Sequence, residues 1–167
     1  ALDEDEVSDS NLPSEDKKKS GAQASDSEPD EKADPSAKEA PHVTFTGLPH
    51  ITKYRAWRLS CAKNVAGASV LPESAYRWYL KVFKAKTMEE LAHSGKFMTL
   101  DTKIGATLGS LLTGTLQSEI SLLEEKMEKV GKLLKGRQIA WKTHQHNKLQ
   151  QTEGAMISMT DILNVKM

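Results

Sequence analysis

The sequence predicts an all-α fold, a small helical bundle of about five to seven helices that follows a disordered acidic tail. From residue 50 onward, apolar residues recur at intervals of three and four, which is the period of a helix. No run alternates with the period of two that a half-buried strand needs. All nine aromatic residues fall between Phe45 and Trp141, so we expect the core to form in this part of the chain.

The charges divide the chain into two parts. Residues 1 to 41 carry 13 acidic and 5 basic side chains, whereas residues 42 to 167 carry 10 acidic and 18 basic ones. The first part has only Leu2, Val7 and Leu12 as large apolar residues, so it cannot offset the entropy of ordering. We therefore expect residues 1 to 41 to be a disordered acidic tail. Residues 42 to 167 suit one helical domain, which we expect to be truncated at its C-terminal end.

Several classes of protein are disfavoured by what the sequence lacks. The single cysteine, Cys61, excludes an internal disulfide, and no Cys-x-x-Cys motif occurs that would predict a zinc module. The chain has no apolar stretch of 18 residues and no recognisable signal peptide. We expect a soluble intracellular protein that has no membrane partner, no small-molecule substrate and no cofactor.

The first half of the domain shows four helical segments. The first begins after Pro49 and ends near Gly67 or Ser69, and the second has Pro72 in its first turn. Thr87 opens a short third segment with a capping box that stops at Gly95. Thr99 can cap the fourth, where Gly105 and Gly109 either weaken the helix or allow close backbone contact.

The most regular apolar pattern lies further on, with steps of four, three, four, three and four. It consists of Leu116, Ile120, Leu123, Met127, Val130 and Leu134. A dimerising coiled coil is one interpretation, but a bundle helix with its stripe in the core is favoured because the pattern is shorter than three or four heptads. Ile139 and Trp141 continue on another helix or a bent continuation, and Ser158 or Thr160 can cap a last one.

These patterns together predict the residues of the core. They are Tyr54, Trp57, Cys61, Tyr76, Leu80, Phe83, Leu108, Leu116, Ile120, Leu123, Met127, Val130, Leu134, Ile139 and Trp141.

No motif in the sequence predicts an active site. His144 and His146 diverge by about 200° on a helix, so a surface pair is favoured over a metal site. Cys61 lies on an apolar stripe, which predicts a buried structural thiol. Asp101 and Glu119 have no paired-carboxylate motif around them, and we expect no enzymatic activity.

A row of basic residues is the one candidate for nucleic-acid contact. It comprises Lys126, Lys129, Lys132, Lys135 and Arg137, and we call it the basic ladder. Positioned cations suffice for a sequence-independent phosphate contact. Steps of three residues rotate each lysine by about 60° from the last, however, so the ladder winds round the helix. A solvated face with internal ion pairs is therefore the favoured interpretation.

Several short segments, in this order, resemble the Gag-like segment of copia-like LTR-retrotransposon polyproteins over about residues 45 to 167. They include Tyr54-Arg55-Ala56-Trp57-Arg58, Ala75-Tyr76-Arg77-Trp78, Met88-Glu89-Glu90-Leu91-Ala92, Leu100-Asp101-Thr102-Lys103, Leu133-Leu134-Lys135-Gly136-Arg137-Gln138-Ile139 and Thr160-Asp161-Ile162-Leu163-Asn164-Val165. In two respects the chain departs from that pattern. The chain stops where relatives continue into another helical stretch, and Thr143 and Asn147 stand where apolar or aromatic residues are expected. No zinc knuckle is present in the sequence either.

The resemblance implies a helical capsid-type domain that multimerises into a particle around RNA. On this basis the partners are copies of the chain itself and RNA, in the cytoplasm or, alternatively, in the nucleus. Two other functions stay open from the sequence. One is a monomeric basic helical domain that binds nucleic acid without sequence specificity, and the other is a host-adopted or decayed fragment with a role in protein interaction.

Overall fold

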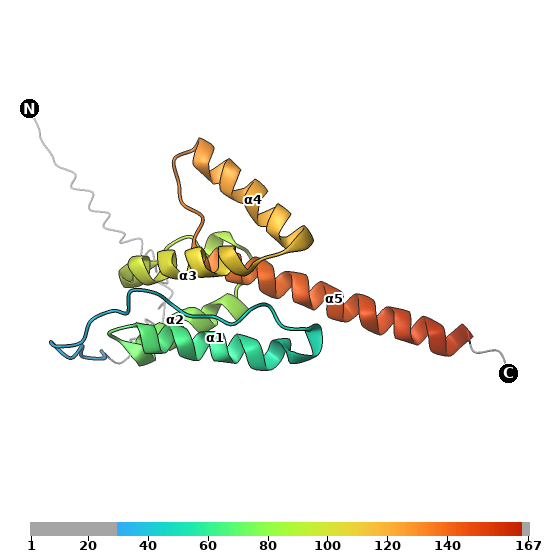
Figure 1. Cartoon of the computed structure of the whole chain (residues 1–167), viewed down its shortest axis with the longest axis horizontal. Coiled ribbons are helices and arrows are strands. Elements are labelled where there is room, and N and C mark those ends of the chain that lie inside the picture. Colours follow the sequence, from blue (N-terminus) through green and yellow to red (C-terminus); the bar gives the residue numbers. More distant parts are fainter. Residues whose placement is uncertain (1–29, 165–167) are drawn as a thin grey trace, which may run out of the picture. The chain divides into compact units, whose positions relative to one another are not determined.

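The computed structural model describes residues 30 to 164, and the predicted disorder of residues 1 to 29 lies outside this range. The described chain contains five α-helices, joined in part by short 3-10 turns, and it contains no strand. This confirms the predicted all-α class. The helices are α1 (Tyr54–Ala68), α2 (Pro72–Leu80), α3 (Met98–Leu111), α4 (Gly114–Lys129) and α5 (Gly136–Asn164) (Figure 1).

The first two helices form largely as the apolar spacing predicts. In α1, Trp57 and Cys61 are buried at the predicted spacing, and Pro72 occupies the first position of α2. The large buried side chains of α2 are Trp78 and Tyr79, whereas three predicted core residues lie further out. Tyr76, Leu80 and Phe83 are only partly buried and pack at the edge of the core.

Two glycines let α3 and α5 cross at backbone contact. A Cβ atom on Gly136 would lie 2.3 Å from the carbonyl oxygen of Asp101 and 2.5 Å from the backbone nitrogen of Gly105. No side chain fits in that space. Close backbone contact was one of the two roles predicted for Gly105, and Gly105 fulfils it, whereas a Cβ atom on Gly109 would meet nothing within 4 Å.

The fourth helix is shorter than its apolar stripe. Leu116 and Ile120 are buried in the bundle, and Leu123 and Met127 pack partly against it. The helix ends at Lys129, and Gly131 then adopts a left-handed backbone with φ of 66°. The chain therefore leaves the helical register. Val130, predicted to be in the core, is 64% exposed, while Leu134 reaches the core from the loop that leads to α5.

One long helix replaces the two that the sequence predicted after Gly136. α5 runs without interruption to Asn164, and neither Ser158 nor Thr160 caps a new helix. The Thr160 hydroxyl donates to the carbonyl of Met156 within the same helix. The hydroxyl therefore makes its hydrogen bond within its own helix, as threonine hydroxyls do in helix interiors.

The predicted N-terminal caps also differ from those in the structure. Phe97, not Thr99, precedes α3, and the Thr99 hydroxyl donates instead to Glu39. The capping box at Thr87 becomes a single 3-10 turn (Glu89–Leu91), where the Glu90 carboxylate accepts from the backbone N–H of Lys86. Both segments start where predicted within a few residues, but with other hydrogen bonds.

Contacts with the helices begin before residue 42, where the tail was predicted to end. The Glu31 carboxylate accepts the backbone N–H groups of Glu73 and Ser74 in the first turn of α2. Glu39 forms an ion pair with Lys103 on α3, and the Ala40 backbone N–H donates to Ala68. The compact unit thus begins at Glu31. Charged side chains and one backbone hydrogen bond make these contacts, which a scan for apolar residues does not detect.

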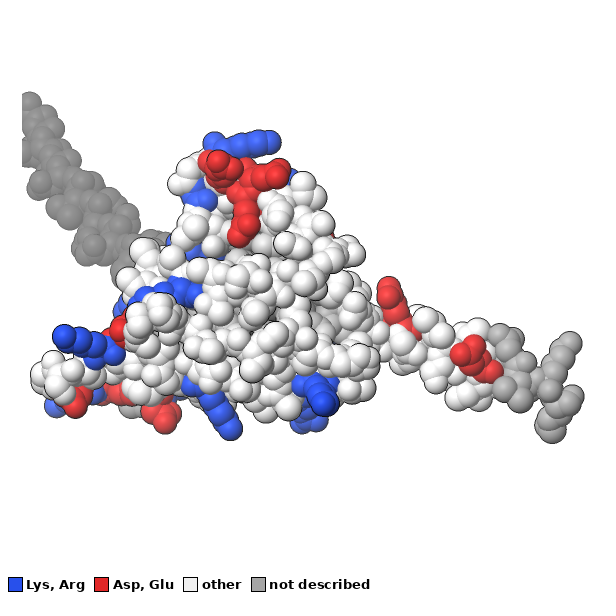
Figure 2. Space-filling model, viewed as in Figure 1, with Lys and Arg blue, Asp and Glu red and all other residues white. Residues whose placement is uncertain are grey.

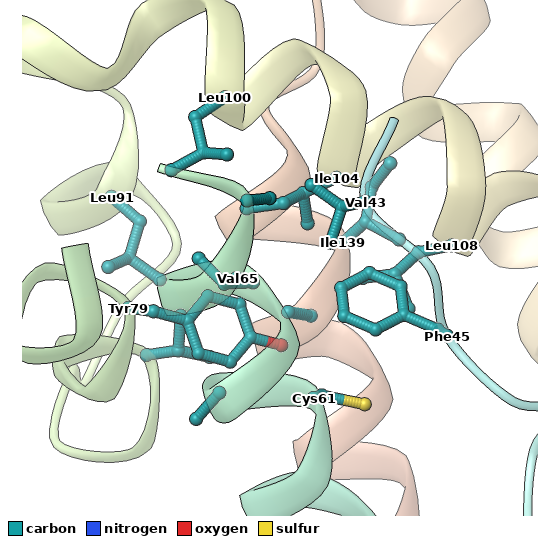
Figure 3. Packing of buried hydrophobic residues seen from close by; sticks show 14 of the residues in the cluster. Val43, Phe45, Cys61, Val65, Tyr79, Leu91, Leu100, Ile104, Leu108 and Ile139 are labelled. Carbon is teal, nitrogen blue, oxygen red and sulfur yellow. The ribbon is translucent and has the colours of Figure 1, made fainter. Parts of the chain in front are cut away.

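An extended segment then closes the core. Val43 and Phe45 are buried, and the carbonyls of Val43, Thr44 and Thr46 accept side-chain hydrogen bonds from α3 and α1. Figure 3 shows Phe45 and Val43 beside core residues of α1, α2, α3 and α5, including Cys61, Tyr79, Leu108 and Ile139. None of the helices in residues 30 to 164 is both apolar and long enough to span a bilayer.

Candidate functional site

The basic ladder is not one surface in the structure. Lys126, Lys129 and Lys132 are exposed at the end of α4 and in the loop after it, and Lys135 is partly buried. Glu124, Glu125 and Glu128 lie among them, and Figure 2 shows red and blue side chains together at this end of α4. The local charges therefore largely cancel at this end of α4.

The prediction that Arg137 is an exposed member of the ladder is wrong. Its side chain is only 3% exposed. Its guanidinium lies 4.3 Å from the centre of the Trp78 ring and donates to the carbonyls of Trp78 and His93. Its Nε is 3.9 Å from Oδ2 of Asp101. It cannot contact a nucleic acid in this conformation, and its role is structural.

Asp101 is the buried anion that accompanies Arg137. It accepts the Ser94 hydroxyl at 2.6 Å and the backbone N–H of Arg137 at 2.8 Å. Burial raises the pKa of Asp101, and the hydrogen bonds and the guanidinium act in the opposite direction. Burial of Asp101 could have been predicted from the sequence. Asp101 lies three residues before Ile104 and seven before Leu108, on the core side of α3.

The C-terminal part of α5 exposes a long apolar surface. Of the eleven large hydrophobic side chains that are exposed in the described chain, six lie between residues 149 and 163. We call them the apolar end of α5: Leu149, Met156, Ile157, Met159, Ile162 and Leu163. Figure 2 shows this end as white with isolated acidic side chains. Exposed apolar surface of this extent is typical of an interaction site.

Spacing places four of these residues on one narrow face. Leu149, Met156 and Leu163 are seven residues apart, and Met159 lies between the last two. At 100° per residue, the four span about 80° of arc. Ile157 and Ile162 widen the face on its two sides. Glu153 and Asp161 are the charged residues between positions 149 and 163, so the surface carries little charge.

A pocket lies between α1 and α5, just before the apolar end. Its cavity volume is about 330 Å³, and we call it the cationic pocket. It is lined by Tyr54, Arg55, Arg58, Phe83, His144, Lys148 and Gln151. Three of these side chains are cationic and none is acidic, so the pocket is a region of positive potential.

His144 forms the floor of the cationic pocket. It is 6% exposed, and its Nδ1 lies 3.1 Å from the Tyr54 hydroxyl, so the prediction of a surface histidine pair is wrong for this residue. The rings of Tyr54 and Phe83 pack against it. Burial, followed by the nearby charges of Lys148 and Arg58, lowers the pKa of His144 to about 4. The imidazole is therefore neutral at pH 7.

Other reactive groups in the described chain are positioned as structural residues. Cys61 is buried, as predicted, and burial raises the pKa of its thiol to about 12. Thr143 and Asn147, the two polar residues that depart from the Gag-like pattern, are buried and hydrogen-bond to carbonyls one turn earlier in α5. Within residues 30 to 164, no group of three His, Cys, Asp or Glu side chains could hold a metal ion.

Comparisons of this chain with protein-family models, with curated proteins and with solved structures find no match.

Proposed function

We propose that this chain is a structural assembly module, without catalysis of its own, whose copies associate through the apolar end of α5. The observation that carries the proposal is the exposure of six large hydrophobic side chains on one stretch of helix. Burying one such side chain contributes about 1.5 to 3 kcal/mol. A surface of this kind in water favours association.

A second copy of the chain is the occupant that the spacing favours. Leu149, Met156 and Leu163 recur every seven positions, so two identical helices can bury them against each other in a short contact of about two heptads, without an extended coiled coil. Such an interface uses the same residues on both chains, which is the usual arrangement in symmetric dimers. Glu153 and Asp161 are the charges between positions 149 and 163, so repulsion between two copies is small.

The resemblance to Gag-like segments supports the same function on independent grounds. A capsid-type protein encloses RNA by multimerising, and an apolar helix end provides one contact for that purpose. We propose a larger, capsid-like assembly around RNA as the biological form. A single symmetric contact through α5 yields only dimers, so this larger assembly requires at least one more surface.

Light scattering across a range of concentrations tests the proposal. The wild-type chain should gain mass with concentration in the absence of nucleic acid. Met156→Lys places a charge in the centre of the apolar end and should shift association to at least tenfold higher concentration, because a buried unpaired lysine is costly. Met98→Lys is the matched control, since Met98 is 58% exposed at the start of α3 and Met156 is 65% exposed.

Two results would count against self-association. One is a wild-type mass that equals the monomer at all concentrations tested. The other is an equal effect of both lysine variants, which would mean that added charge, and not this surface, controls association.

A further inference from the structure

The cationic pocket brings together three positive charges from two helices. Arg55 and Arg58 lie one turn apart on α1, and Lys148 faces them from α5. Within the described residues, no aspartate or glutamate forms an ion pair with any of the three. Like charges around one cavity repel each other, so an anion that enters the cavity is stabilised by all three.

The pocket is already shaped before any anion arrives. The Arg58 guanidinium lies 4.7 Å from the centre of the Phe83 ring, and that ring packs edge-on against His144 at 5.0 Å. The Tyr54 hydroxyl in turn fixes the histidine. A cation held by its surroundings loses less conformational entropy when it binds an anion than a free surface lysine does.

The polar groups of the pocket also suit an anion. Gln151 brings an amide group to the rim. If the Tyr54 hydroxyl donates to Nδ1 of His144, then Nε2 carries the proton and can donate to an anion in the cavity. A second cavity of about 380 Å³ adjoins the pocket and shares Arg55 and Gln151 with it. The lining of this second cavity also lacks acidic side chains.

We propose that the cationic pocket is a binding site for phosphate groups, with Arg55, Arg58 and Lys148 as the binding cations. The phosphate belongs either to a small free phosphate compound or to an RNA backbone. Both present the same charged oxygens to the arginines. The site does not depend on self-association, because its lining residues come from one chain. It also replaces the basic ladder as the place for an anionic ligand, since Glu124, Glu125 and Glu128 lie close to the lysines of the ladder.

The test compares two double variants that remove the same charge. Arg55→Gln/Lys148→Gln changes two exposed residues of the pocket, whereas Lys126→Gln/Lys129→Gln changes two exposed residues of the ladder. Inorganic pyrophosphate and single-stranded oligouridylate are titrated into each protein at low salt, and affinity is measured by calorimetry. NMR signals of the His144 ring report occupancy of the pocket itself.

The pocket variant should bind pyrophosphate at least tenfold more weakly than the wild type, and the ladder variant should bind it as the wild type does. Pyrophosphate should also shift the His144 ring signals. If the pocket variant loses RNA in the same proportion and pyrophosphate competes with RNA, the site takes backbone phosphates. If RNA binding is unaffected, the site takes small phosphates.

Two results overturn the proposal. In one, both double variants lose the same affinity, so that binding depends only on total charge. In the other, neither probe binds the wild type or shifts the His144 signals. Light scattering on the pocket variant distinguishes a failure of phosphate binding from a failure of self-association, because this variant should self-associate as the wild type does.

Discussion

Arg137 and Lys132 carry the same charge five residues apart, yet their surroundings are opposite. Arg137 is buried between Trp78 and Asp101, whereas Lys132 is exposed in the loop before α5. Sequence spacing placed both in one basic ladder, because it treats every lysine or arginine as a surface residue. Burial of an arginine depends on a partner such as Asp101, which is 36 positions away in the chain.

Arg137→Gln should lower the free energy of unfolding by about 3 to 5 kcal/mol, because it leaves Asp101 buried without its cation. Lys132→Gln removes the same charge from the surface and should change it by less than about 0.5 kcal/mol. Urea denaturation followed by circular dichroism measures both. Similar midpoints for the two variants would contradict the structural role of Arg137.

His144 should make stability depend on pH in a defined range. Its pKa is about 4 in the folded chain and close to 6.5 when unfolded. Between these values the unfolded chain binds a proton that the folded chain does not, so stability falls as the pH decreases from 6.5 to 4 and levels off below. We expect a loss of about 3 kcal/mol from this residue.

Urea midpoints of the wild type and of His144→Gln at several pH values measure this contribution. The unfolding free energy of the wild type, relative to that of His144→Gln, should decrease as the pH falls from 6.5 to 4. A constant difference across this range would mean that the histidine does not titrate as described.

At the scale of the element, spacing predicted where helices form better than where they end. The apolar periods of α1 and α3 located both helices, because their buried faces follow the helix period. The stripe in α4 continued past the end of the helix, since Gly131 turned the chain while Leu134 still reached the core. Nothing in local spacing distinguishes a core residue on a helix from one on the following loop.

The crossing of α3 and α5 at Gly105 and Gly136 gives a sharp prediction for the pair of helices. Gly136→Ala should destabilise the fold by about 3 kcal/mol or more, because its methyl group would overlap backbone atoms of α3. Gly109 lies on α3 and has open space around it. Gly109→Ala should therefore stabilise the fold by about 0.5 to 1 kcal/mol, because alanine favours the helix more than glycine does. Thermal unfolding of both variants checks the opposite signs. Two shifts of the same sign would mean that the helices do not cross in this way.

At the scale of the whole molecule, the sequence predicted the bundle but not its surfaces. The all-α class and the buried thiol of Cys61 followed from apolar spacing alone. The cationic pocket did not, because Arg55 and Lys148 are more than 90 positions apart and only the packing of α1 against α5 brings them together. The apolar end of α5 was also missed, since the sequence pattern was divided there between two shorter helices.

These surfaces assign different tasks to the two halves of α5. The first half contributes Arg137, Ile139 and Thr143 to the bundle. Lys148 and Gln151, near the middle of the helix, line the cationic pocket, and the second half then extends as an apolar surface that no other described residue covers. We propose that the bundle does not need the second half and that this half serves contact with another copy.

A cysteine cross-linking experiment tests this claim most directly. The natural Cys61 is buried and its thiol has a raised pKa, so one introduced cysteine is the reactive thiol of the folded protein. Met156→Cys and, as a matched control, Met98→Cys are oxidised at low concentration, and covalent dimers are measured on a non-reducing gel. Self-association through the apolar end of α5 predicts rapid dimer formation through position 156 and little through position 98. Equal dimer formation at the two positions, or none at position 156, would contradict it.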